Sequence, residues 1–308
     1  MQELAKRRGV GIPNLLGDVI EAEPSGFQKL HCLIDAQPLD KSHRRKPGGA
    51  LASARKGTRT QGPAVIVMTE MPGISPHVAR FARWVRDAGF SVYMPSLFGK
   101  DGDVPDAETA ARVFRRACVS AEFRALGGGS SSPVSNWLRA LARLAHGESG
   151  GPGVGAIGMC FTGNFALNMM LEPALLAPVL SQPSLPLDNP AGIESSADEL
   201  AQVRSRLERE DLTVLAYRFA GDSFCRAERF AAYQSALGDR FIGRVLPDTA
   251  ANTGPKPPFF EQFVKTPHSV VTVHLVDESG QLTLAARDEI LAFFQKRLKS
   301  VLPTIGHR

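Results

Sequence analysis

The chain has 308 residues, of which 43% are hydrophobic and 22% are charged, an ordinary composition for a soluble globular protein. A chain of this length can bury a large apolar core without disulfide bonds or structural metals. Its four cysteines are widely spaced and form no CxxC pair, which argues against a zinc knuckle and against a dithiol redox motif. The N-terminal residues contain no unbroken apolar stretch, so we expect no secretory signal and a cytoplasmic protein with reduced thiols.

The formal net charge is +5, and most of the excess lies in one short segment. Seven lysines and arginines occur between residues 41 and 59 with no acidic residue among them, which leaves the rest of the chain at about −2. Residues 41–62 are also rich in small residues and glycine, so we expect a basic, flexible insertion there. This distribution does not favour a nucleic-acid partner.

Strand-like and helix-like segments alternate along the rest of the chain. Short apolar, β-branched runs predict buried strands, whereas apolar residues at helical spacing predict amphipathic helices. The predicted strands are 64–68, 90–94, 154–159, 178–181 and 212–219, with a further candidate at 30–36. The predicted helices are 76–88, 106–118, 134–146, 161–171, 195–209, 227–237 and 284–298, and 248–265 is predicted as a loop.

This alternation predicts an α/β protein whose mostly parallel central sheet carries helices on both faces. No internal repeat or change in composition divides the chain, so we expect a single domain spanning 1–308. The apolar stretch 154–180 resembles a membrane span in composition, but Asn164, Asn168, Glu172 and Pro173 interrupt it. A buried strand followed by a helix accounts for it better, and we expect no membrane association.

Cys160 lies where the predicted strand 154–159 meets the helix that follows it, in the stretch Gly158-Met-Cys-Phe-Thr-Gly163. Ligands of parallel α/β sheets gather at the carboxyl ends of the strands. A helix N-terminus at that place favours a thiolate over a thiol. Cys160 is therefore a candidate nucleophile, although a cysteine is also among the residue types most often buried for packing alone.

This stretch resembles the nucleophile elbow of the α/β-hydrolase fold in the cysteine variant that marks the dienelactone hydrolase family. The resemblance implies the α/β-hydrolase fold. It differs in one position, because Thr162 stands where the family usually has glycine, and we expect the threonine to crowd the turn.

The remaining members of a triad follow in the family's order. Asp222, in Gly221-Asp222 after a predicted strand, takes the position of the acid, and His268, followed by Ser269, takes that of the histidine. Asp222 could also be a simple helix cap, and Asp188 and His274 are the alternatives for the two roles.

A second block, from residue 63 to residue 99, resembles the family's segment in which a strand ends in a glutamate. On that resemblance Glu70 contacts the resting thiol, and the backbone N–H groups of Met71 and Phe161 form the oxyanion hole. The resemblance further implies hydrolysis of a small-molecule carboxylic ester or lactone through an acyl-thioenzyme, with no metal or organic cofactor, by a monomer or weak homodimer.

The sequence departs from the family where the substrate carboxylate is held. The family places an arginine shortly after the catalytic histidine, whereas residues 269–272 here are Ser, Val, Val and Thr. Arg112, Arg115 and Arg116 are the candidates for an anion clamp from a helix. A weakly catalytic binding protein, a thiol sensor and an acyltransferase are the alternative functions.

Overall fold

The computed structural model describes residues 62–119 and 132–299, with no account of the Val119 side chain. A six-stranded sheet runs through this part of the chain, and every neighbouring pair of strands is parallel. The strands are β1 (Ala64–Val67), β2 (Ser91–Tyr93), β3 (Val154–Met159), β4 (Leu175–Ser181), β5 (Val214–Phe219) and β6 (Phe241–Leu246).

The strand order β2-β1-β3-β4-β5-β6 places a topological switch point between β1 and β3. From β1 the chain first adds β2 on one side and then crosses to add β3 on the other. In a parallel sheet such a reversal opens a crevice beyond the carboxyl ends of the two central strands. Glu70 follows the end of β1 and Cys160 follows the end of β3, so both lie at this crevice.

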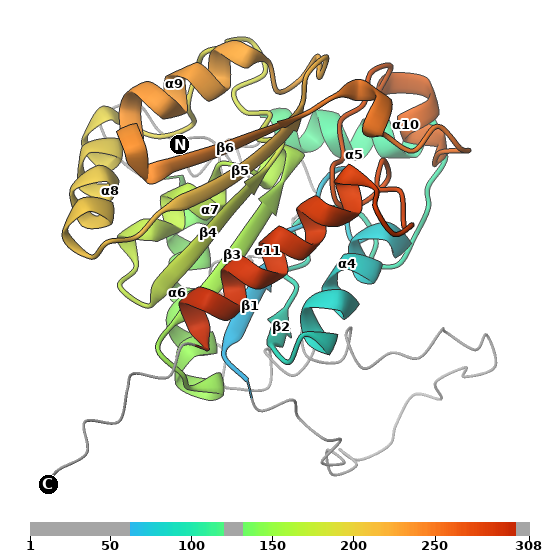
Figure 1. The fold of residues 1–308 in the computed structure, drawn as a ribbon. Coiled ribbons are helices and arrows are strands. Elements are labelled where there is room, and N and C mark those ends of the chain that lie inside the picture. Colours follow the sequence, from blue (N-terminus) through green and yellow to red (C-terminus); the bar gives the residue numbers. More distant parts are fainter. Residues whose placement is uncertain (1–61, 120–131, 300–308) are drawn as a thin grey trace, which may run out of the picture.

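Helices cover both faces of the sheet, as the alternating pattern predicts (Figure 1). α4 and α11 pack on one face, and α6, α8 and α9 on the other, while α5 and α10 contact each other. The helices are α4 (Pro76–Asp87), α5 (Ala107–Val119), α6 (Pro133–Ser149), α7 (Phe165–Asn168), α8 (Ala197–Arg209), α9 (Ala227–Leu237), α10 (Pro258–Phe263) and α11 (Leu282–Leu298).

Two hydrophobic clusters, one on each face, bury the sheet. Successive side chains of β1 alternate between them: Val65 and Val67 belong to the cluster with α4 and α11, and Ile66 to the cluster with α6. A strand that is buried on both faces has no solvent-facing positions, so its side chains are nearly all apolar. This is why β1 and β3 are unbroken apolar runs that the sequence identifies easily.

The helix predicted at 161–171 is wrong in its length. A 3₁₀ turn at Cys160–Thr162 is followed by the four-residue α7 and a second 3₁₀ turn at Met169–Leu171. The side-chain amides of Asn164 and Asn168 donate to the carbonyl oxygen of Glu194 at 2.7 and 2.9 Å. The segment is therefore tied sideways to the loop after β4, and Cys160 does not precede a long helix.

Two elements of the C-terminal half were not predicted. β6 is an edge strand whose middle residues are exposed, so its sequence carries little of the apolar signal of a buried strand. α10 lies within the predicted loop 248–265 and begins at the proline pair 257–258, a composition typical of loops but also of a helix start. The residues after His268, whose alternation is compatible with a strand, form turns instead.

Two sequence predictions concern residues that the structure does not describe. The candidate strand 30–36 and the basic segment 41–62, except for Gly62, lie outside the described residues. Within the described ranges, none of the helices has the length and apolar character needed to cross a membrane.

Phe294 of α11 tests the packing of the helix on the sheet. Its side chain is fully buried, with its ring 6.1 Å from that of Phe90. We expect Phe294→Ala to lower the free energy of unfolding by about 3–5 kcal/mol, because a large cavity remains. Urea unfolding measures this, and Leu282→Ala, at a position 48% exposed on the same helix, should stay within about 0.5 kcal/mol. Equal losses in the two variants would contradict this packing.

Candidate active site

The backbone of Cys160 adopts a left-handed conformation at the end of β3, with φ of 54°. A residue with a side chain is disfavoured there by about 1–2 kcal/mol. The strain turns the chain sharply out of the strand and presents the thiol at the switch point. A sharp, strained turn after a strand is the backbone geometry of a nucleophile elbow.

Two glycines make the sharp turn possible. A Cβ atom on Gly158 would lie 2.1 Å from the carbonyl oxygen of Thr162, and one on Gly163 would lie 2.5 Å from the Cα of Pro183. Both distances are far below van der Waals contact. The glycines therefore allow close approach between segments of backbone.

Thr162 does not crowd the turn as expected. It is fully buried, and its Oγ1 accepts the N–H of Met159 at 2.9 Å. The same hydroxyl lies 3.1 Å from the carbonyl oxygen of Thr69 and can donate to it. The side chain that replaces the usual glycine thus ties the elbow to the segment after β1.

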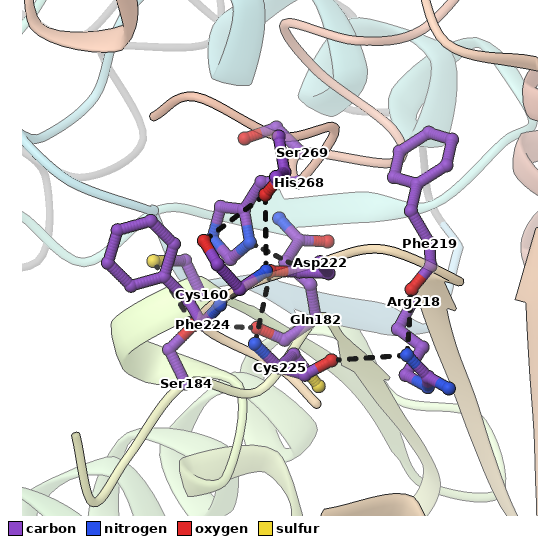
Figure 2. A network of polar contacts seen from close by, with 12 residues as sticks. Cys160, Gln182, Ser184, Arg218, Phe219, Asp222, Phe224, Cys225, His268 and Ser269 are labelled. Atoms are coloured by element: carbon purple, nitrogen blue, oxygen red, sulfur yellow. Dashed lines mark hydrogen bonds and ion pairs between the residues drawn. The ribbon is translucent and has the colours of Figure 1, made fainter. Parts of the chain in front are cut away.

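His268 and Asp222 form a buried pair (Figure 2). Nδ1 of His268 lies 2.7 Å from Oδ2 of Asp222. The other carboxylate oxygen accepts the backbone N–H groups of Phe224 and Cys225, at 2.9 and 3.1 Å. These bonds hold the carboxylate in one orientation, whereas the rival acid, Asp188, is exposed.

The pKa of His268 is raised well above its ordinary value of 6.5. Burial by itself lowers the pKa, but the electrostatic effects of Asp222 and Cys160 and the hydrogen bond to Asp222 raise it by more. With Nδ1 turned to Asp222, Nε2 is the ring nitrogen left for other partners, and His268 and Cys160 line the same cavity. Nε2 is buried and makes no hydrogen bond of normal geometry to a described residue, but the Cys160 side chain is near enough to the ring to raise its pKa.

His274 occupies a different environment from His268. Its Nδ1 accepts the backbone N–H of Ser269 at 3.1 Å. Burial, and then the charge of His268, lower the pKa of His274 to about 4. His274 is therefore a neutral hydrogen-bond acceptor that holds the turn carrying His268, and within the described ranges no carboxylate forms an ion pair with it.

Glu70 lies beneath the site, with 1% of its surface exposed. Its carboxyl oxygens accept the hydroxyls of Ser269 and Thr272, each at 2.5 Å, and the Gln182 amide at 3.3 Å. No hydrogen bond joins it to Cys160 within the described ranges, and its contact with the thiol stays a prediction. Burial raises the pKa of Glu70 above 4.5, although its hydrogen bonds and the charge of His268 oppose the shift.

Met71 and Phe161 line the same cavity as Cys160 and His268. Met71 directly follows Glu70, beyond the end of β1, and Phe161 directly follows Cys160, beyond the end of β3, and their N–H groups as the oxyanion hole stay a prediction. The cavity has a volume of about 300 Å³. Its other lining residues are Ala111, Phe114, Arg115, Ser184, Leu187, Phe224, Phe259, Phe260, Phe263 and Val264.

Ser184 is a site residue that the sequence analysis missed. Its hydroxyl lies 3.6 Å from the Cys160 sulfur and 3.0 Å from the Gln182 carbonyl oxygen, and its backbone N–H donates to the Cys160 carbonyl at 3.0 Å. Gln182 shares the left-handed backbone conformation, with φ of 38°. The sequence position of both residues could have indicated this, because they follow the end of β4, and β4 pairs with β3, the strand that leads to Cys160.

Of the three candidate arginines, Arg115 alone lines the cavity, and it is exposed. Arg112 is turned to Glu108, at 2.7 Å on the surface of α5, and Arg116 is exposed. The described residues contain no cluster of three or more His, Cys, Asp or Glu side chains arranged to hold a metal ion.

Residues 49–191 match the model of the dienelactone hydrolase family. This segment is just under half of the chain, and it contains Glu70 and Cys160 but ends before Asp222 and His268. The resemblance of the chain to this family is therefore confirmed. No curated protein sequence matches the chain.

Solved structures with the same fold include a dienelactone hydrolase-like promiscuous phosphotriesterase from metagenomic libraries, at 19% identity and a TM-score of 0.50 over 77% of this chain and 87% of that one. An esterase of Pyrococcus furiosus matches at 9% identity and a TM-score of 0.40, over 78% of this chain and 83% of that one. A Xanthomonas campestris α/β serine hydrolase without a lid matches at 12% identity and a TM-score of 0.39, over 78% of this chain and 85% of that one. The α/β-hydrolase fold is thereby confirmed, and it rests on the first of these structures.

The buried Glu70 predicts a pH effect on stability. Its folded-state pKa is raised, so its contribution to stability is fully present below about pH 4.5 and is lost as the pH rises through the folded-state value. Glutamine does not ionise. The stability of Glu70→Gln relative to the parent should therefore increase with pH above 4.5 and then level off, with a slope of at most about 1.4 kcal/mol per pH unit.

Urea unfolding of both proteins from pH 4 to pH 8 measures this difference. A difference that stays constant over the whole range would show that Glu70 titrates alike in the folded and unfolded states.

Proposed function

We propose that this dienelactone hydrolase-like protein hydrolyses a carboxylic ester or lactone through a Cys160-His268-Asp222 triad and an acyl-thioenzyme. The observation that carries the proposal is that His268, whose Nδ1 is held 2.7 Å from Asp222, lines the same cavity as the elbow thiol of Cys160. A nucleophile, a base and a group that orients the base are the three parts of such a site.

In the first half of the reaction the Cys160 thiolate attacks the carbonyl carbon. The oxyanion that forms accepts the backbone N–H groups of Met71 and Phe161. When the carbon–oxygen bond to the leaving group breaks, the alkoxide takes a proton from Nε2 of His268. The products of this half are a thioester on Cys160, a free alcohol and a neutral His268.

In the second half a water molecule gives a proton to Nε2 of His268 and attacks the thioester carbon. The carbon–sulfur bond then breaks, Cys160 leaves as a thiolate, and the acid is released. His268 is again an imidazolium, and the nearby Asp222 carboxylate raises its pKa and so favours that form. Asp222 keeps the proton on Nδ1 and stabilises the charged ring in both halves.

Ser184 gives the thiolate a hydrogen-bond donor. Its hydroxyl has one proton and two acceptors within reach, the Gln182 carbonyl and the Cys160 sulfur. A thiolate is the stronger acceptor, since hydrogen bonds to charged groups are about twice as strong as neutral ones. We therefore assign Ser184 to the resting thiolate and to its re-formation when the acid leaves.

Replacing the thiol tests the proposal. We expect Cys160→Ala to lower kcat/KM for p-nitrophenyl butyrate by about 10³-fold or more, because the covalent route is lost. Intact mass spectrometry should detect an acyl adduct on the parent and none on the variant. Cys118→Ala is the matched control, since Cys118 lies on α5 and does not line the cavity, and it should keep parental activity.

Peroxide oxidation of Cys160 without any ester turnover or adduct would instead favour a thiol sensor. Turnover that survives Cys160→Ala would reject the proposed nucleophile.

Ser184→Ala should slow both hydrolysis and alkylation of Cys160 by iodoacetamide at neutral pH by about tenfold, as expected for the loss of a hydrogen bond to a charged group. Parallel changes in the two rates would place the effect on the thiolate and not on substrate binding. The control Ser205→Ala removes an exposed hydroxyl on α8 and should change neither rate. Unchanged alkylation in Ser184→Ala would remove Ser184 from the site.

A further inference from the structure

We propose that the cavity beside Cys160 selects esters with an uncharged, apolar acyl group the size of one aromatic ring or a six-carbon chain, and that α10 supplies the selecting wall. This inference rests on the proposed function, since it assigns the substrate class of the same site. The acyl group is the part that stays on the Cys160 sulfur after the alcohol has left, so the cavity that the sulfur lines must hold it.

The wall of the cavity is aromatic and comes from segments far apart in the sequence. Phe114 lies on α5, Phe161 follows the nucleophile, and Phe224 lies in the loop after β5. α10 and the residue that follows it add Phe259, Phe260, Phe263 and Val264. An apolar lining of this kind favours apolar groups because their transfer from water is favourable over the whole contact area.

The rings support one another, so the wall exists before a substrate binds. The ring of Phe114 lies 6.5 Å from that of Phe161 and 6.2 Å from that of Phe259. Within α10 the rings of Phe259 and Phe263 are 5.4 Å apart. A preformed pocket loses little free energy to ordering when it is filled.

The size of the cavity limits what can enter. At about 300 Å³ it lies at the small end of the range for ligand pockets. An apolar cavity of about 150 Å³ is enough for one benzene molecule. The space therefore fits a single ring with a short linker to the ester carbon, or a chain of about six carbons.

Charge argues against an anionic acyl group. The turn after His268 is where the family carries an arginine. Here the hydroxyls of Ser269 and Thr272 donate to Glu70. Val270 and Val271 are buried in the hydrophobic cluster with α4 and α11. No side chain of this turn is available for a substrate carboxylate.

Among the described lining residues, Arg115 is the single cation apart from His268, and it is exposed. An exposed ion pair changes a binding constant by about fivefold at most. This is too little to offset the cost of placing a carboxylate among aromatic rings.

Hydrolysis of p-nitrophenyl esters with one leaving group and different acyl groups tests the proposal. We expect kcat/KM for the hexanoate to exceed that for the acetate by about 250-fold when all four extra methylenes are buried at about fourfold each, and that for the 3-phenylpropanoate by at least as much. The hemisuccinate, which is anionic, should be no better than the acetate. Faster hydrolysis of the acetate or the hemisuccinate would overturn the proposal.

Variants locate the selection. Phe259→Ala and Phe263→Ala should each lower kcat/KM for the two large esters at least tenfold and change that for the acetate less than threefold. Phe293→Ala, on α11 and outside the cavity, is the control and should leave the ratios unchanged. Arg115→Ala should change kcat/KM for every ester by less than about fivefold. Equal losses on large and small esters in the α10 variants would reject α10 as the selecting wall.

A binding measurement separates this inference from the proposed chemistry. Calorimetry with folded Cys160→Ala protein compares 3-phenylpropanamide with acetamide, neither of which is turned over. Tighter binding of the aromatic amide, weakened by Phe259→Ala, supports the apolar pocket even if no ester is hydrolysed and the proposed function fails. Equal, weak binding of both amides would reject the pocket whatever the esters show.

Discussion

The left-handed backbone of Cys160 is the constraint on which the candidate site depends. Such a conformation persists only where the surroundings over-determine it. Here Gly158 and Gly163 allow the close approach, Thr162 bonds the turn to the segment after β1, and Ser184 donates its backbone N–H to the Cys160 carbonyl. Two neighbouring segments, after β1 and after β4, thus hold one strained residue, which is costly for stability but places the sulfur at the crevice between β1 and β3.

The buried Glu70 organises the underside of the same crevice. Through Ser269 and Thr272 it holds the turn that carries His268, and through Gln182 it contacts the segment after β4. His274 supports that turn from a second direction. A polar cluster of this kind stabilises when every member has a partner. The catalytic histidine we propose is therefore positioned by groups that do not themselves line the cavity.

Most of the sheet and the members of the proposed triad could be predicted from the sequence, because buried strands and the Cys160 elbow leave strong local signals. The edge strand β6 left little signal because its middle residues are exposed, and α10 was hidden in a proline-rich stretch. The contacts of Glu70 and Ser184 join residues far apart in the chain, which periodicity cannot reveal. The aromatic cavity escaped for the same reason, since its walls come from several elements.

The three phenylalanines of α10 differ in their contacts, and this difference affects which of them can be substituted. The helix carries none of the proposed triad, and two of its rings, Phe259 and Phe263, serve the cavity wall. Phe260 is different, because its ring also lies 6.2 Å from that of His274, which supports the His268 turn. Under the proposed function, Phe259 and Phe263 could therefore be exchanged to alter substrate range, whereas Phe260 is constrained by its contact with His274.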